Sequence, residues 1–342
     1  MKPTRLSRPV FFVASLAALF LLAGNASATD PCAGLTGSAA TNLAERVASV
    51  ACRENALWYR PFIDTNGRLA SMEVAEAETA RLGDGITPAW KRVADYWLGS
   101  GLLPAMASYP GASECAYASN DGYPLPACRA FLVDRPWSAA FVSFVMVQAG
   151  VPGFRSSPSH VDYVRDAYLS PQTGPFRLAD PDVEKPAAGD LLCFVRGTSP
   201  VAGYTGLKTF LAGTASGGLA MHCDVVVGAN PGGDNRLYAV GGNVLQGVTM
   251  RMLNLNRNGM LWGLPRGNNT GCSPANEAAC SFNRQNWAAL LKLRPQAPLA
   301  QPPGAPVGPS TSPACCVNCV VGAQPPVPRC RIEDPAGIPP RG

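Results

Sequence analysis

The chain has 342 residues, of which 47% are hydrophobic and 15% charged, and its formal net charge is +5. This length gives room for one large or two modest domains. The small net charge and the absence of a basic stripe interleaved with aromatic residues argue against a nucleic-acid-binding protein.

The first 28 residues have the features of a secretory signal peptide. Three basic side chains precede an apolar run over residues 10–23, and Ala26-Ser27-Ala28 follows it. This order is typical of a signal that is cleaved after Ala28. Subtracting the three basic charges from +5 leaves +2, and no later stretch is long enough to span a membrane. We therefore predict an exported protein, periplasmic or secreted, with no membrane span in its mature form.

All 12 cysteines follow this signal. An even number of cysteines in an oxidising compartment predicts a set of disulfides. Three pairs are favoured by their positions in the sequence: Cys32 with Cys52, Cys115 with Cys128, and Cys272 with Cys280. Cys193 and Cys223 lie in predicted neighbouring strands and are a fourth candidate pair. Four more cysteines lie together near the end of the chain: Cys315, Cys316, Cys319 and Cys330. The spacing of Cys316 and Cys319 also fits a zinc knuckle, but no histidine lies nearby, so we favour disulfides and expect neither metal nor cofactor.

Residues 29–133 are predicted to form a helical N-terminal extension with a disulfide loop. Apolar residues at helical spacing predict helices over 39–59 and 87–98. Thr87 is the expected N-cap of the second helix, with Pro88 in its first turn.

A helix is predicted to open on Pro136, Trp137 and Ser138 and to close at Gly150, because proline suits a first helical turn and glycine a helix end. Backbone N–H groups at a helix N-terminus favour developing negative charge, which makes Ser138 a candidate nucleophile. A second helix should follow, capped by Ser159 and carrying His160 in its first turn.

After these helices the pattern changes to short apolar strands joined by tight turns, which indicates an antiparallel sheet and an α+β fold. Strands are predicted over 186–196, 221–227, 236–241 and 244–253, with a long loop over 197–218 and a break at Gly242-Asn243. We assign 134–295 to this domain and 296–342 to a Pro-rich, Cys-containing tail.

The mature chain has only two histidines, His160 and His222, so candidates for a general base are few. His222 opens a predicted strand, and Asn243 follows the end of the next one. A serine at a helix start, a histidine on one strand and an amide on the next form a plausible nucleophile, base and orienting residue.

Several separated motifs resemble those of known families. The segments Pro136-Trp-Ser-Ala-Ala-Phe141, Ser159-His160 with Tyr163, Gly189-Asp-Leu191 with Cys193, His222-Cys-Asp224 and Gly241-Gly-Asn243 resemble the domain of unknown function 2272 family. Residues 137–141 and 186–191 are also similar to the catalytic helix and first-strand turn of CHAP and NlpC-type cell-wall amidases and peptidases. This resemblance implies a papain-like fold, with a helix packed on an antiparallel sheet.

One departure bears on activity, because this chain has Ser138 where those enzymes have cysteine. A hydroxyl depends wholly on its base, whereas a thiol is partly ionised at neutral pH. The resemblance implies an exported hydrolase of an amide or peptide bond in peptidoglycan, with Ser138, His222 and Asn243 as its catalytic residues. The alternatives are an inactive cell-envelope protein that binds wall peptides in the same cleft, and a secreted effector hydrolase.

Each residue also has a structural interpretation. Ser138 could only cap its helix, His222 could be a satisfied core histidine, and Asn243 could supply turn geometry. His160 is a second base, a substrate contact or a structural partner. The remaining candidates for substrate binding or support of the site are Trp137, which could line a cleft or pack beneath the helix, Asp190, which suits a turn better than acid catalysis, and Asp224.

Overall fold

The computed structural model describes residues 30–35, 40–119, 125–197, 199–213, 216–267 and 271–295. The predicted signal peptide and the predicted tail, including its four cysteines, lie outside the described residues.

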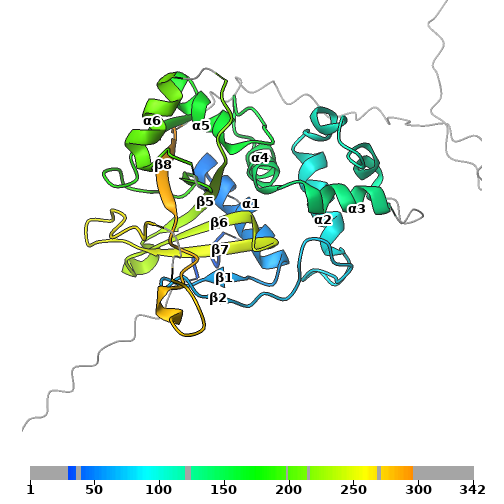
Figure 1. The fold of residues 1–342 in the computed structure, drawn as a ribbon, viewed down its shortest axis with the longest axis horizontal. Coiled ribbons are helices and arrows are strands. Elements are labelled where there is room, and N and C mark those ends of the chain that lie inside the picture. Colours follow the sequence, from blue (N-terminus) through cyan, green and yellow to red (C-terminus); the bar gives the residue numbers. More distant parts are fainter. Residues whose placement is uncertain are drawn as a thin grey trace, which may run out of the picture. The chain divides into compact units, whose positions relative to one another are not determined.

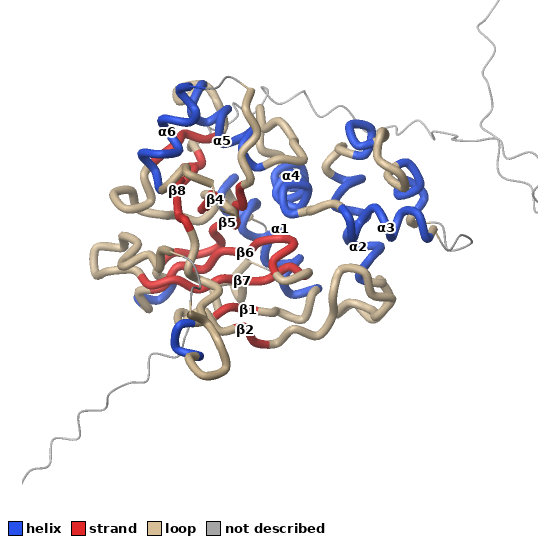
Figure 2. The backbone as a smooth tube through the Cα atoms, viewed as in Figure 1, coloured by secondary structure: helices blue, strands red, loops and turns tan. Residues whose placement is uncertain are grey.

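The described residues form a mixed α+β fold of six α-helices and an open eight-stranded sheet (Figures 1 and 2). The helices are α1 (Leu43–Leu57), α2 (Ala89–Gly99), α3 (Pro126–Asp134), α4 (Ser138–Gln148), α5 (His160–Leu169) and α6 (Gly203–Gly213). The strands are β1 (Phe62–Ile63), β2 (Leu69–Ala70), β3 (Phe176–Ala179), β4 (Leu191–Val195), β5 (Met221–Ala229), β6 (Arg236–Val244), β7 (Gly247–Asn254) and β8 (Asn286–Leu293).

The sheet has the strand order β2-β1-β7-β6-β5-β4-β8-β3. Its neighbours pair antiparallel, as predicted, except that β1 runs parallel to β7. Helix α1 packs on β5, and β1 extends the sheet beside β7. Part of the region assigned to an N-terminal extension is therefore built into the same sheet.

Two apolar clusters cover the two faces of the sheet. The larger contains the buried side chains of α1, α2, α4 and α5 together with Cys193, Cys223 and Val225. The smaller contains Phe194, Leu237 and Trp287, covered by leucines from the segment after β7. Figure 1 shows α4 between the sheet and the pair α2 and α3, in agreement with its contacts to α2, β5 and β6.

Helix α4 follows from its sequence, as predicted. Nine consecutive residues, from Ser138 to Met146, are buried, so this part of the helix is shielded from water on all sides, and only its last turn, at Val147, is exposed. Gly150 then adopts a φ of 66°, and the N–H groups of Gly150 and Val151 donate to the carbonyls of Val147 and Met146. This is a Schellman end, which requires a left-handed residue and so favours glycine. The helix holds its first residue, Ser138, at a fixed place beside the sheet.

One predicted helix cap is wrong. Helix α2 begins at Ala89, with Pro88 at the N-cap position, and the Thr87 hydroxyl donates to Asp84 instead. A nearby carboxylate thus takes the hydroxyl, which local sequence alone does not reveal. Ser159 is the N-cap residue of α5, as predicted, although its side chain makes no capping bond and Ser157 donates to Asp162 in the first turn.

Two predicted loop features are also wrong. The segment 197–218 contains the helix α6, whose Leu207 and Leu211 are buried in the larger cluster. Strand β6 continues through Gly242-Asn243 to Val244 rather than breaking there, with an irregular register between Gly241 and Val244. Packing against the rest of the chain overrides the Gly, Ser and Thr content of these stretches.

Four disulfides are present in the described residues, and they are the four pairs predicted from position: Cys32–Cys52, Cys115–Cys128, Cys193–Cys223 and Cys272–Cys280. Cys193 and Cys223 lie directly opposite each other on β4 and β5. Within the described ranges, no single helix is long and apolar enough to cross a membrane. The pair α3 and α4 passes that test of length and composition only as a bent pair.

Candidate functional site

Ser138 is hydrogen-bonded to His160. The Ser138 Oγ lies 2.7 Å from His160 Nε2, and both side chains are 4% exposed. Each is the first residue of its helix, so this bond joins the N-termini of α4 and α5. The partner predicted for Ser138 is His222, whereas the structure brings the other histidine, His160, to its hydroxyl.

Tyr163, one turn along α5, contacts the second nitrogen of the same ring. Its hydroxyl is hydrogen-bonded to His160 Nδ1. When Nδ1 carries the hydrogen, Tyr163 accepts it and Nε2 is left to accept the Ser138 hydroxyl hydrogen. Burial, the nearby positive charge of a protonated His222 and that of Arg196 hold the pKa of His160 well below its usual value. His160 is therefore neutral at neutral pH, which is the state that a general base requires.

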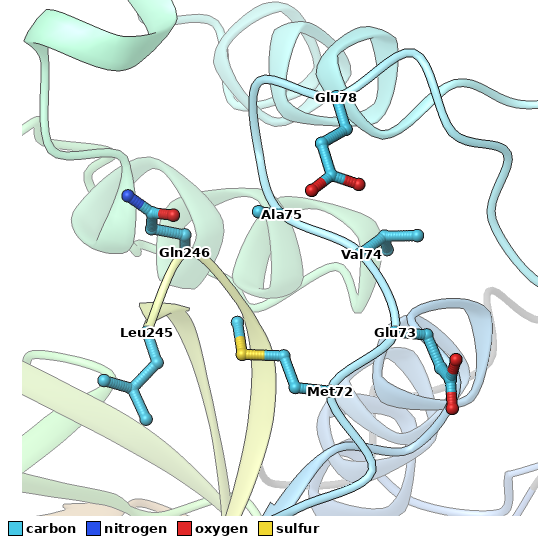
Figure 3. A pocket seen from close by; sticks show the side chains of 7 residues that line it. All are labelled: Met72, Glu73, Val74, Ala75, Glu78, Leu245 and Gln246. Atoms are coloured by element: carbon cyan, nitrogen blue, oxygen red, sulfur yellow. The ribbon is translucent and has the colours of Figure 1, made fainter.

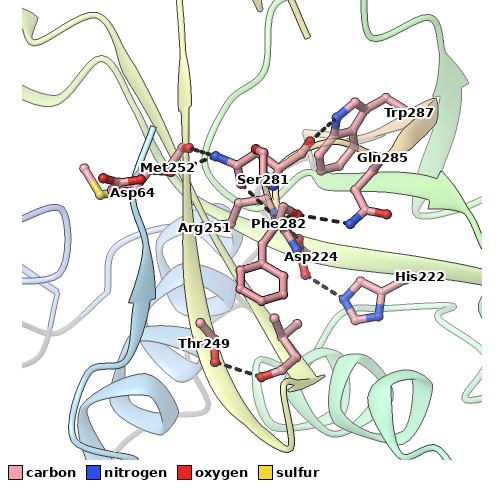
Figure 4. A network of polar contacts seen from close by, with 12 residues as sticks. Asp64, His222, Asp224, Thr249, Arg251, Met252, Ser281, Phe282, Gln285 and Trp287 are labelled. Carbon is pink, nitrogen blue, oxygen red and sulfur yellow. Dashed lines mark hydrogen bonds and ion pairs between the residues drawn. The ribbon is translucent and has the colours of Figure 1, made fainter. Parts of the chain in front are cut away.

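His222 belongs to a second buried polar group, shown in Figure 4. Its Nε2 lies 2.7 Å from Asp224 Oδ1, two residues along β5, and Asp224 Oδ2 accepts a 3.0 Å bond from Arg251 Nε on β7. Burial alone would raise the pKa of Asp224, but the positive charges of His222 and Arg251 and their hydrogen bonds hold it below its ordinary value. Asp224 is therefore a carboxylate, and it fixes the orientation of the His222 ring.

Arg251 also bonds to the segment before β8. Its Nη1 donates to Phe282 O at 2.6 Å and to Asn283 Oδ1 at 2.9 Å. Asn283 donates in turn to the carbonyls of Asp64 and Met252 (Figure 4). The network therefore ties β5, β7 and the turn after β1 to the segment before β8, which carries the partners of Arg251.

The two histidines lie side by side, with ring centroids 5.2 Å apart. One ring is bonded to a serine hydroxyl and a tyrosine, and the other to a carboxylate. Two neighbouring rings in such different surroundings can divide the acid and base roles of one reaction.

Asn243 contacts the start of α4 rather than a histidine. With its amide oxygen turned inward, Oδ1 accepts from the backbone N of Trp137 at 3.1 Å and from the indole Nε1 of Trp137 at 3.2 Å. Trp137 immediately precedes Ser138, so Asn243 positions the helix N-terminus. In the described structure the residue that orients His222 is Asp224, not Asn243.

The glycines before Asn243 are required by close packing on both sides. A Cβ on Gly241 would overlap the Asp224 carboxylate, and one on Gly242 would overlap the Phe141 and Trp137 side chains. Only glycine lets the sheet approach the charged network and the start of α4 at once.

Trp137 is fully buried and supports α4 from beneath. Its ring stacks on Trp58 and Tyr96 at centroid distances of 5.9 and 5.4 Å. Its indole Nε1 donates to Glu76 Oε2 at 2.5 Å. Burial raises the pKa of Glu76. Trp137 is therefore a packing and positioning residue.

A pocket of about 170 Å³ opens beside His222. Apolar side chains form much of its wall, and its polar lining residues are Arg196, His222, Asn243, Arg251 and Gln285. Asn243 is bonded to the residue before Ser138, and His222 adjoins the ring bonded to Ser138. The pocket thus lies next to the start of α4.

A second pocket, of about 470 Å³, lies on the other side of the turn between β6 and β7 (Figure 3). Leu245 lines both pockets, so they adjoin at this turn. In Figure 3 the Glu78 carboxylate and Met72 point toward the space beside Leu245 and Gln246, whereas Glu73 points away from it.

Asp190 has a structural position. Its carboxylate accepts from the backbone N of Ala187 and Leu293 and pairs with Lys292, which closes the turn into β4 against β8.

Arg251 and Glu76 are site residues that sequence reasoning missed. Arginine within an apolar strand was a signal for Arg251, because a charge buried there needs a partner; Glu76 carried no such signal.

Within the described ranges, no group of three or more His, Cys, Asp or Glu side chains could hold a metal ion.

No curated protein and no solved structure matches the chain. A family model described as "Uncharacterized protein conserved in bacteria (DUF2272)" matches residues 84–293, which is more than half of the chain. The match spans Ser138, both histidines and Asn243, and the protein thus belongs to the DUF2272 family.

Proposed function

We propose that this protein is an exported hydrolase that cleaves amide or peptide bonds by acyl transfer to Ser138. The observation that carries the proposal is the 2.7 Å bond from Ser138 Oγ to a buried, neutral His160 at the start of a helix. His160 Nε2 would take the hydroxyl proton as Oγ attacks the carbonyl carbon. Backbone N–H groups at the start of α4 would stabilise the oxyanion that forms.

His222 is proposed as the acid that protonates the leaving amine. Asp224 holds its Nε2, and no described residue hydrogen-bonds its Nδ1. His222 also lines the pocket, where a leaving group would lie.

The papain-like fold and the peptidoglycan substrate are part of the same proposal. A helix with a nucleophile at its first residue packs on antiparallel strands that carry a histidine near one strand start and an amide near the next strand end. The motif resemblance to CHAP and NlpC-type enzymes favours cell-wall peptides as substrate. Four disulfides in the described residues support export.

The second candidate is a cell-envelope protein that binds wall peptides without cutting them. The near-complete burial of Ser138 and His160 favours it, since substrate must reach the hydroxyl. The partner of His160 Nδ1 also favours it, because the neutral Tyr163 hydroxyl stabilises an imidazolium less well than a carboxylate does.

The test is digestion of peptidoglycan sacculi by purified protein and by Ser138→Ala, His160→Gln and His222→Gln variants, with released fragments measured by mass spectrometry. We expect Ser138→Ala to abolish release and His160→Gln to lower its rate about 10²- to 10⁴-fold. Ser159→Ala, beside the site but without a capping bond, is the control. Release that is unchanged in Ser138→Ala, or absent in the native protein while sacculi still bind, would reject hydrolysis in favour of binding.

A further inference from the structure

The pocket beside His222 has an excess of positive charge. Among the residues that the structure describes, two arginines line it, Arg196 and Arg251, and no acidic residue does. Arg251 is neutralised by Asp224, whose other oxygen holds His222. Arg196 therefore supplies a charge that no group in the pocket wall balances.

Arg196 is placed there by the sheet. It directly follows β4, and its backbone N donates to Ala220 O at 2.8 Å, just before β5 begins. Its side chain is exposed, and no described residue forms an ion pair or hydrogen bond with its guanidinium. Its charge nevertheless reaches the site, because it contributes to holding the pKa of His160 low.

The rest of the pocket suits a small amphiphilic group. Phe194, Val244 and Phe282 supply apolar wall, while Asn243 and Gln285 supply amide groups. A guanidinium at such a mouth binds a carboxylate in a bidentate manner, and the apolar wall accepts the carbon atoms attached to it.

We propose that this pocket binds a peptide fragment bearing a free carboxylate, held by Arg196 beside the bond to be cleaved. That a bond is cleaved beside this site rests on the proposed function, whereas the binding of the carboxylate by Arg196 does not depend on it. It makes Arg196 the residue that selects acidic over amidated peptides.

The test uses the Ser138→Ala protein, without an affinity tag, so that no turnover occurs and His160 and His222 give the only histidine signals. Acetyl-alanine and its neutral amide are titrated in turn while histidine ring resonances are followed by NMR, with His160→Gln assigning them. We expect the acid to shift the His222 signals and to bind about tenfold more tightly than the amide. Arg196→Gln should remove this preference and Arg196→Lys should keep part of it.

Arg257→Gln, an exposed arginine outside the pocket lining, is the matched control and should leave the preference intact. Equal binding of acid and amide, binding of neither, or a preference that survives Arg196→Gln would overturn the inference. If the acid binds through Arg196 but sacculi are never cut, the carboxylate site stands and the hydrolase proposal fails.

Discussion

Gly241 shows how strictly a single position limits this site. It has no positive φ, so its backbone alone would accept other residues. The restriction comes from Asp224, whose carboxylate lies where a Cβ would be and is fixed there by His222 and Arg251. The Gly-Gly pair is therefore set by side-chain packing and not by turn geometry.

Gly241→Ala should lower the free energy of unfolding by about 1–3 kcal/mol, the usual cost of overpacking a core, because the added Cβ would overlap both Asp224 and Val244. Urea denaturation measures this. Gly247→Ala on the adjoining strand is the control, since its Cβ would make only ordinary contacts. Equal losses in the two variants would contradict the packing argument.

His160 should make stability sensitive to mild acid. In the unfolded chain a histidine takes up a proton near pH 6.5, whereas the buried ring in the fold stays neutral to lower pH. The unfolded state then binds more protons, so the free energy of unfolding falls as pH drops below about 6.5, by up to about 1.4 kcal/mol per pH unit.

Denaturation curves between pH 7.5 and 5 should show this slope in the native protein and a reduced slope in His160→Gln. Tyr59→Phe, an exposed tyrosine away from the site, serves as the control and should keep it. A slope that is the same in His160→Gln would mean that another group binds the protons.

At the scale of elements, the two faces of β5 contact different parts of the molecule. His222 and Asp224 point to the charged network, while Cys223 and Val225 join the helix-covered core. The network bonds β5 through Asp224 to Arg251 on β7, and then to the segment before β8. It therefore connects elements that are far apart in the sequence.

Removing the charge at the centre of this network should be costly. Arg251→Met leaves Asp224 a buried carboxylate with only His222 beside it, so we expect about 3–5 kcal/mol of destabilisation by urea denaturation. Arg266→Met removes an arginine whose ion pair with Asp182 is exposed, and should cost less than about 1 kcal/mol. Comparable losses of stability in the two variants would show that the buried pair of Arg251 and Asp224 contributes no more to stability than the exposed pair of Arg266 and Asp182.

At the scale of the whole molecule, the sequence predicts elements better than it predicts contacts between them. Helix α4 and the four disulfides follow from apolar runs, Gly150 and cysteine positions. Strands β1 and β2, with two residues each, are too short to show any periodicity. The bond between Ser138 and His160 depends on how two helix starts approach in space, which no local pattern encodes.

The same limit applies to Asn243. Its place after two glycines led to the prediction that it orients His222, whereas its partner is Trp137, which is fixed by the packing of β6 against α4. A short sequence motif indicates which residues lie near the site, but it does not determine which of them are in contact.

The predicted signal peptide leads to a prediction for the whole chain. Expressed with its first 28 residues in a Gram-negative bacterium, the protein should be recovered outside the cytoplasm with Thr29 as its N-terminal residue. N-terminal sequencing and intact mass check this. Replacing the apolar run over 10–23 with polar residues should retain the protein, uncleaved, in the cytoplasm; cleavage in that variant would contradict the signal.

The disulfide between Cys193 and Cys223 has a consequence for how the site is kept correct. Side chains alternate along a strand, so sliding β5 by one residue against β4 would turn His222 into the helix-covered core and Cys223 toward the pocket. A covalent bond between directly opposite residues forbids that slip. In an oxidising compartment the crosslink therefore fixes the register of β5 against β4, and with it the face of the sheet on which His222 and Asp224 lie.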